Sequence, residues 1–185
     1  MATKKTKIKE WYSIIAPKMF DERELGKTMI SDPEHLVGRK INISILELTN
    51  DFSKYYMKIN FQVVKVEEKK AYTIFSGTEI MRDYISRLVM RRTRRIDNVE
   101  NVTTKDGSKL VVKTITIVPR RIKSSIQKVI REEIKNMIKN EVEELTLEEF
   151  VQSMISDEVK NKILSHIRRI YPVRTFEIRR VETIK

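Results

Sequence analysis

Cysteine is absent from this 185-residue chain, and histidine and glycine are scarce, with two and four copies. Without cysteine the chain has no disulfide framework and no thiolate metal site. The LGKT segment at 25–28 lacks the upstream glycine of a phosphate-binding P-loop, and His35 and His166 do not have metal-ligand spacing. No motif of a catalytic nucleophile is visible either. We therefore predict that the chain is not an enzyme and that it uses no cofactor and no metal.

Long apolar runs are also missing. No segment approaches the ~18–20 consecutive apolar residues of a membrane-spanning helix. The apolar stretch behind the N-terminal lysines is interrupted by Ser13, Pro17 and Lys18, and it has no small-residue cleavage site of a secretory signal. We expect a soluble, cytoplasmic protein with no membrane partner and no small-molecule substrate.

Positive charge is abundant. Lysine and arginine number 38 against 26 acidic residues, which gives a formal net charge of +12. Such a surface attracts polyanions, of which nucleic acid is the commonest in a cell; the alternative is a basic soluble protein without such a partner. The charge is uneven, because segment 81–96 holds six arginines against Asp83 while acids gather in 140–150. This separation favours a nucleic-acid-binding side.

Alternating apolar residues predict several strands. The period of two is clear at 39–48 and 54–68, and 71–77 returns as a hairpin partner after the polar EEKK turn. Two further β-rich runs, 98–104 and 109–118, flank Asp106-Gly107, a dipeptide typical of tight hairpin turns. The last predicted strand covers 174–184.

Helical spacing predicts four helices. The first covers 78–95, with Thr78 as a possible N-cap, and the longest covers 121–145. A third begins at the capping box formed by Thr146 and Glu149. A fourth is capped by Ser156 and ends at Tyr171, because the proline that follows disfavours helix in the residue before it.

The order of elements fits an α+β protein with an antiparallel sheet or barrel. We predict about six to seven strands, an inserted basic helix, two to three C-terminal helices and a final strand that returns to the sheet. Residues 1–20 are predicted to form a basic arm, and 21–185 a single globular domain. Within it, 21–118 is mainly strands plus one helix, 119–171 is mainly helical, and 172–185 is the last strand.

The helix predicted at 78–95 carries the sharpest binding signal. Arg87, Arg91, Arg94 and Arg95 are spaced i, i+4, i+7 and i+8, so they would share one helical face. Arginine suits phosphate because its planar guanidinium donates two hydrogen bonds at once. The alternative is a solvated charged face, but Asp83 is the one nearby acid. Phosphate contact is the interpretation that we prefer.

The N-terminal arm combines lysines with aromatic residues. Its lysines suit phosphate contacts, and each neutralised phosphate releases counterions. Trp11, Tyr12 and Phe20 could stack on nucleic-acid bases. They could equally pin the arm to the core of the protein, and the sequence leaves both readings open.

Several of these segments carry a resemblance. KEWYSIIAPKMF, LGKT, VGRKINISILELTND, FSGTEIMRDYISRLV, TTKDGSKL and RRIYPVRTFEIRRV occur in this order along the chain. Together they resemble the archaeal and eukaryotic small-subunit ribosomal protein family called S-three-a-e, also S-one-e, with the archaeal branch as the better fit. Glu47 departs from the family's aspartate, and the region 122–144 is the least similar.

The resemblance implies a β-barrel core with appended helices and a structural role in the small ribosomal subunit. It also implies two kinds of partner, 16S-type rRNA on the platform and neighbouring platform ribosomal proteins. The alternatives are a free nucleic-acid-binding regulator that acts off the ribosome and a basic enzyme that acts on nucleic acid. The predicted RNA-binding residues are Lys4, Lys5, Lys7, Lys9, Trp11, Lys27, Arg39, Arg82, Arg87, Arg91, Arg92, Arg94, Arg95, Arg120, Arg121 and Lys123.

Overall fold

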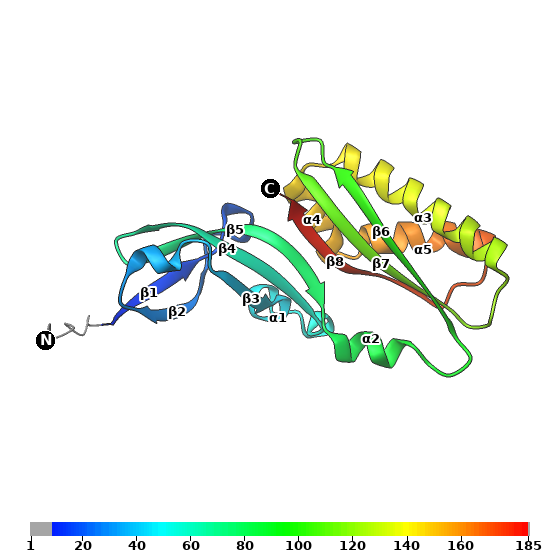
Figure 1. The fold of residues 1–185 in the computed structure, drawn as a ribbon, viewed down its shortest axis with the longest axis horizontal. Helices are drawn as coiled ribbons and strands as arrows, with labels where there is room; N and C mark the ends of the chain where they lie inside the picture. Colours follow the sequence, from blue (N-terminus) through cyan, green and yellow to red (C-terminus); the bar gives the residue numbers. More distant parts are fainter. Residues whose placement is uncertain (1–8, 185) are drawn as a thin grey trace, which may run out of the picture. The chain divides into compact units, whose positions relative to one another are not determined.

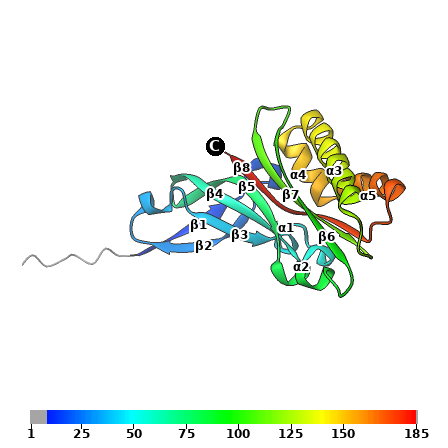
Figure 2. The ribbon, with the colours of Figure 1, turned by 45° about the vertical axis from the view of Figure 1, so that its right-hand side comes forward.

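A computed structural model describes residues 9–184 of the chain (Figures 1 and 2). The chain divides into two compact units, Met1–Gly77 and Thr78–Lys185. Strand pairing follows the order β2-β1-β5-β8-β7-β6, and β3 joins through β4, which also pairs with β5. The protein is therefore a mixed α+β structure, as its sequence predicts.

The first unit is built mainly of strands. They are β1 (Glu10–Ile15), β2 (Glu24–Ile30), β3 (Lys40–Ser44), β4 (Met57–Glu67) and β5 (Lys70–Ile80), whose last residues belong to the second unit. β1 pairs antiparallel with β2 and parallel with β5, and β3 pairs antiparallel with β4. Short helical segments connect them: η1 (Lys18–Phe20), η2 (Pro33–Leu36), α1 (Ile45–Thr49) and η3 (Phe52–Lys54).

Alternation gives each strand of the first unit a core face and an outer face. Tyr12 and Ile14 of β1, Val63 of β4 and Ala71 of β5 are buried together with Leu36. Their neighbours in sequence point to the opposite side, since successive side chains of a strand alternate. The buried side forms the small apolar core of this unit.

The second unit places three helices on a sheet. α2 (Arg82–Leu88) leads into β6 (Arg94–Thr103) and β7 (Lys109–Val118), and α3 (Ser124–Glu144), α4 (Leu147–Ile155), α5 (Glu158–Ile170) and β8 (Thr175–Ile184) follow. β7 pairs antiparallel with both β6 and β8. Figures 1 and 2 show α3, α4 and α5 together on one face of β6, β7 and β8.

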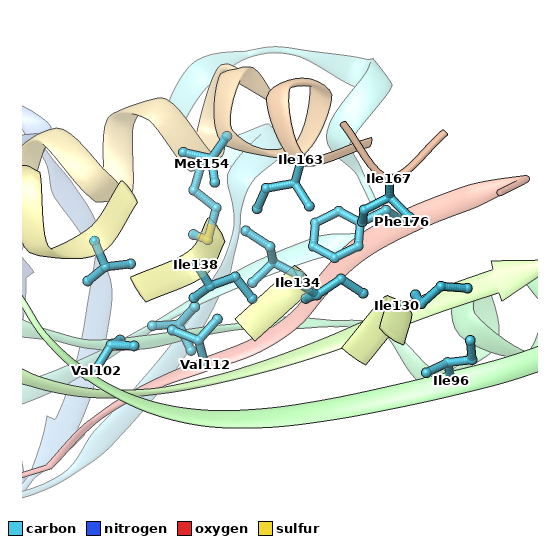
Figure 3. Packing of buried hydrophobic residues seen from close by; sticks show 14 of the residues in the cluster. Ile96, Val102, Val112, Ile130, Ile134, Ile138, Met154, Ile163, Ile167 and Phe176 are labelled. Atoms are coloured by element: carbon cyan, nitrogen blue, oxygen red, sulfur yellow. The ribbon is translucent and has the colours of Figure 1, made fainter. Parts of the chain in front are cut away.

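The apolar stripe of α3 explains this arrangement. Ile130, Ile134, Ile138 and Val142 recur at four-residue intervals and are fully or almost fully buried. Figure 3 shows Ile130, Ile134 and Ile138 beside Phe176 and side chains from α4 and α5. Each fully buried isoleucine contributes roughly 2 kcal/mol by removal of apolar surface from water. This core fixes the helices on the sheet.

Two of the predicted signals at helix ends are confirmed. Thr146 Oγ1 accepts a hydrogen bond from the Glu149 amide, and the Glu149 side chain accepts one from the Thr146 amide, so the capping box of α4 is present. α5 ends at Ile170 with Tyr171 as C-cap, as the following proline predicts. Its N-cap is Asp157 rather than Ser156, which instead closes α4.

The helix predicted at 78–95 is mostly wrong. α2 covers Arg82–Leu88 alone, its N-cap is Met81, and Thr78 lies buried in β5. Arg94 and Arg95 begin β6, where all ten residues pair with β7. The hydrogen-bonded ladder and the burial of Ile96 outweigh the helical propensity of the arginines.

Three further features of the predicted fold differ from the structure or are not confirmed by it. The strand predicted at 39–48 ends at Ser44, and Ile45 opens α1 instead of continuing the alternation. Barrel closure is not confirmed, because β2 and β3 do not pair with each other among the described residues and the sheet stays open. Within residues 9–184 eight strands form the sheet, one more than the predicted upper number of about seven.

Candidate nucleic-acid interface

Three connections of the second unit meet at one end of its sheet. β6 pairs with β7 through Arg94 opposite Val118, so the chain before β6 and the chain after β7 leave the ladder at the same end. The amide of Arg174 donates to the Ile117 carbonyl at 2.9 Å, which brings the start of β8 to that end as well. Figure 1 shows the α2–β6, β7–α3 and α5–β8 connections converging there.

This convergence gathers basic side chains that are far apart in sequence. We call the set the basic end, and it consists of Arg91, Arg92, Arg94, Arg120, Arg121, Lys123, Arg168, Arg169 and Arg174. All nine are exposed. The first six are among the predicted RNA-binding residues, so the structure brings together residues that the sequence separates into two groups.

Acidic residues are missing from the three connections. Segments 84–96, 119–131 and 159–176 contain no aspartate or glutamate. Within residues 9–184, no ion pair is found for any member of the basic end. Uncompensated like charges repel one another, so a polyanion that lies across this end would gain both attraction and relief of that repulsion.

Neutral contacts hold some of these side chains while leaving their charge uncompensated. Arg94 Nη2 donates to Gln127 Oε1 at 3.4 Å, and the buried Gln127 in turn donates to the Ile122 carbonyl at 3.1 Å. Arg174 Nη1 lies 2.7 Å from Met90 Sδ, and Arg168 Nε donates to the Val173 carbonyl at 3.4 Å. The remaining guanidinium N–H groups can face an external phosphate.

Other predicted residues lie elsewhere in the second unit. Arg82 and Arg95 line a cavity of about 420 Å³ together with Lys113, Arg179 and Arg180. Much of its charge is compensated internally: Arg95 forms two-pronged hydrogen bonds with Asp97. Glu182 in turn lies 2.7 Å from the Lys113 ammonium and 2.6 Å from the Arg180 guanidinium. The cavity is therefore a weaker candidate for phosphate than the basic end.

Arg87 was predicted to bind RNA together with Arg91 and Arg94, but it does not belong to the basic end. It stays on α2, where its Nε donates to the Asp83 carbonyl at 3.3 Å. The single helical face of Arg87, Arg91, Arg94 and Arg95 does not form, because the helix ends at Leu88 and Arg92 adopts a left-handed backbone with φ of 67°. Of the four, only Arg91 and Arg94 belong to the basic end, and loop and strand geometry brings them there.

The first unit holds the remaining described residues of the prediction. Lys9 is exposed, Lys27 lies 3.9 Å from Glu24, and Arg39 Nη1 donates to Thr28 Oγ1 at 3.2 Å. Trp11 in β1 is 58% exposed. The predicted phosphate contacts of Lys4, Lys5 and Lys7 fall outside the described residues.

The three N-terminal aromatic residues have different environments. Tyr12 is buried, and Phe20 packs edge-to-face on Phe61 with ring centroids 5.5 Å apart. These two aromatic residues therefore pack on the protein itself, which is one of the two possibilities that the sequence leaves open. Trp11 stays exposed, so stacking on bases is open to this residue.

Sequence reasoning missed three members of the basic end. Arg168, Arg169 and Arg174 were visible as local charge clusters, but nothing local shows that the end of α5 and the α5–β8 connection meet the loops at 89–93 and 119–123. Strand register supplies that information. Among the described residues, no group of three histidine, cysteine or acidic side chains could hold a metal ion, and no helix is long and apolar enough to cross a membrane.

Comparison with known proteins gives a family. The model described as the Ribosomal S3Ae family matches residues 2–185. Small ribosomal subunit protein eS1 of Methanopyrus kandleri is 39% identical over 100% of this chain and 90% of its own length. The proteins of the same name from Desulfurococcus amylolyticus and Sulfurisphaera tokodaii are 36% and 37% identical, over 94% and 98% of this chain and 82% and 94% of their own lengths.

Proposed function

The chain belongs to the Ribosomal S3Ae family, and we propose on this premise that it is a structural constituent of the small ribosomal subunit. In this role it binds 16S-type rRNA on the platform, next to other platform proteins, and supports translation. It is ribosome-associated in the cytoplasm and carries out no catalysis. The relatives' name, small ribosomal subunit protein, supports the assignment.

The basic end is the observation that carries rRNA binding. Nine exposed cations from three connections and the adjoining ends of α5 and β6 lie at one end of the sheet without an acidic partner among the described residues. Arginine and lysine there neutralise rRNA phosphates, and the fixed sheet and helices behind them set the geometry. Recognition by such a surface depends on the shape of folded RNA more than on base sequence.

Sedimentation of a cell lysate through a sucrose gradient tests the proposal. The protein is followed by antibody through washes of increasing salt. Co-sedimentation with small subunits that survives the high-salt wash is expected, because many phosphate contacts and protein packing act together. Absence from the subunit peak, or release at moderate salt, would instead indicate a free or peripheral RNA-binding regulator.

A further inference from the structure

One sheet face of the first unit exposes large apolar side chains. Trp11, Met29, Tyr72 and Ile74 are 58%, 47%, 38% and 43% exposed, and they belong to the paired strands β1, β2 and β5. The opposite face of the same strands is the buried core described above. Exposed apolar groups that cluster in this way mark binding surfaces more often than isolated ones do.

Strand register arranges this face in rows. Trp11 is opposite Met29, and Ser13 is opposite both Lys27 and Lys70. Ile15 is opposite Tyr72 of β5 and, after a register shift, Glu24 of β2. Cross-strand partners point to the same side of a sheet, and residues two apart along a strand share that side. An apolar row is therefore followed by a row of two lysines around a small serine. The third row is apolar at Ile15 and Tyr72 and carries one acid, Glu24, at its β2 end, so the two lysines still outnumber the acid on this face.

The spacing of the rows suits an extended chain. Trp11 and Ile15 are four residues apart in β1, which corresponds to roughly 13 Å at the usual rise of a strand. The lysine row lies midway. A ligand that lies along β1 would meet an aromatic ring, then positive charge, then a second aromatic ring.

Charge on this face favours an anionic ligand. Lys70 has no acidic partner in the described part of the chain. The acidic contact of Lys27 is the 3.9 Å contact with Glu24. Both side chains are well exposed, so this ion pair stabilises the fold little and leaves Lys27 able to contact a ligand. Lys9 is exposed just before β1.

We propose that this face, formed by Trp11, Lys27, Met29, Lys70 and Tyr72, binds a single-stranded RNA segment. Unpaired bases stack on Trp11 and Tyr72, and Lys27 and Lys70 neutralise the phosphates between them. Aromatic side chains are the usual platforms for unstacked bases, whereas the bases of a duplex are already stacked and paired. The choice of RNA as the nucleic acid rests on the proposed function.

A protein partner fits this face less well. The cores of protein–protein interfaces are depleted in lysine, because burial of an ammonium group away from water is costly. Here the lysine row lies between the two apolar rows rather than at their rim. The same arrangement is favourable for RNA, whose phosphates and bases alternate in reach of the surface.

Trp11 provides a direct probe, since it is the chain's only tryptophan. The full chain is titrated with a twelve-nucleotide single-stranded oligoadenylate and, separately, with a twelve-base-pair RNA duplex. Saturable quenching of tryptophan fluorescence is expected with the single strand and much weaker quenching with the duplex. Equal quenching by both would overturn the proposal.

Variants separate stacking from charge. Trp11→Ala and Tyr72→Ala are each expected to weaken single-strand binding roughly tenfold, as followed by polarisation of a labelled oligonucleotide, while Trp11→Phe and Tyr72→Phe keep most of the affinity. The matched control is Phe52→Ala, which removes an aromatic side chain that is 79% exposed on η3. Unchanged affinity in both alanine variants of the sheet face would also overturn the proposal.

The experiments distinguish failure of this RNA-binding face from failure of the proposed ribosomal role. A protein that co-sediments with small subunits, but whose Trp11 fluorescence does not respond to the single strand, leaves the ribosomal role standing and removes this inference. Quenching by the single strand without co-sedimentation supports the face and removes the ribosomal role. Shielding of Trp11 in assembled subunits by a protein would assign the face to a protein partner and overturn the inference.

Discussion

Lys160 Nζ lies 2.7 Å from Glu177 Oε1, and only 3% of the Glu177 side chain and 19% of the Lys160 side chain are exposed. The Tyr84 hydroxyl donates to the same carboxylate oxygen at 3.4 Å, and Asp157 lies 3.7 Å from the ammonium. The ion pair therefore links α5 to β8, and the Tyr84 hydrogen bond links α2 to the same carboxylate. Burial raises the pKa of Glu177, Lys160 and Tyr84 oppose that rise, and the nearby charge of Asp157 adds to it.

Removal of the lysine leaves a buried carboxylate without its counter-charge. Burial opposes the charge of Lys160, but Glu177 and Asp157 outweigh it and raise the lysine pKa, so the ammonium is held firmly. We expect Lys160→Ala to lower the free energy of unfolding by about 3 kcal/mol, measured by urea denaturation at pH 7. Lys162→Ala is the matched control: its lysine pairs with Glu141 at the surface and should cost under about 1 kcal/mol.

The loss in Lys160→Ala should depend on pH. The pKa of Glu177 is raised in the folded state, so the folded protein binds this proton more readily than the unfolded chain does. That contribution favours folding at low pH and is lost as pH rises through the folded pKa. Lys160 lowers the pKa of Glu177, so Lys160→Ala raises this pKa further, and at low pH the buried carboxyl of the variant takes up a proton and needs no counter-charge. The destabilisation should therefore be smaller at pH 5 than at pH 8, and an equal loss at both would contradict the assignment.

The capping box of α4 gives a second prediction. Thr146→Ala removes the side-chain acceptor of the Glu149 amide and should lower the free energy of unfolding by about 1 kcal/mol, measured by thermal or urea unfolding. Hydrogen bonds with Thr146 lower the pKa of Glu149, so the box stabilises the fold above the ordinary glutamate pKa and weakens as pH falls through the folded value. The effect of Thr146→Ala should shrink toward pH 3.

Glu148→Ala is the control for that measurement. Glu148 is exposed in the first turn of α4 but makes no capping hydrogen bond. Its replacement should change the free energy of unfolding by less than about 0.5 kcal/mol. A control loss as large as that of Thr146→Ala would show that first-turn charge, not the box, stabilises the helix end.

Features that depend on a few neighbouring residues could be predicted from the sequence. The capping box at Thr146, the helix end at Tyr171 and the hairpin around Gly107, whose φ is +78°, all follow from local chemistry. The apolar stripe of α3 was equally clear, because its buried residues recur at helical spacing. These elements need no tertiary information.

Features that depend on pairing between distant segments could not be predicted from the sequence. Arg94 and Arg95 read as helix because helical spacing is satisfied up to that point, yet their ladder with Val118 and Ile117 makes them strand. The basic end has the same origin, since register alone brings Arg174 to the loops at 89–94 and 119–123. Local charge predicted a phosphate-binding surface, and only the topology shows which of the basic residues lie together.

The β4–β5 turn offers a third prediction. Glu68 and Lys69 connect the strands with φ of 44° and 65°, the backbone of a primed turn that asparagine and glycine adopt more easily. The double variant Glu68→Asn/Lys69→Gly should raise the free energy of unfolding by about 1 kcal/mol, because left-handed strain of about 1–2 kcal/mol per residue is relieved. The gain is reduced by loss of the exposed Lys69–Glu10 ion pair.

Lys69→Ala separates the two contributions. It removes the ion pair with Glu10 but leaves a side chain at a left-handed position. A loss of under about 1 kcal/mol is expected in urea denaturation, opposite in sign to the double variant. If the double variant is no more stable than the native chain, strain at this turn does not limit stability.

The basic end gives the last prediction, which concerns RNA affinity rather than stability. One arginine is removed from each connection in the triple variant Arg91→Gln, Arg120→Gln and Arg174→Gln. Binding to a small-subunit rRNA fragment should weaken, and the slope of log affinity against log salt should fall in magnitude by about 2–3, because each lost phosphate contact removes just under one unit. Filter binding at several KCl concentrations measures both quantities.

A variant of equal charge tests whether position matters. Lys105, Lys109 and Lys139 are exposed cations of the same unit, and Lys109 pairs with Thr103 at the opposite end of the β6–β7 ladder. Their replacement by glutamine lowers the net charge by the same amount but removes no residue of the basic end. The slope should then change by much less, since distant charges act only through the screened field of the whole protein. Equal slopes for both triple variants would mean that net charge, and not the convergence of the three connections, governs RNA binding.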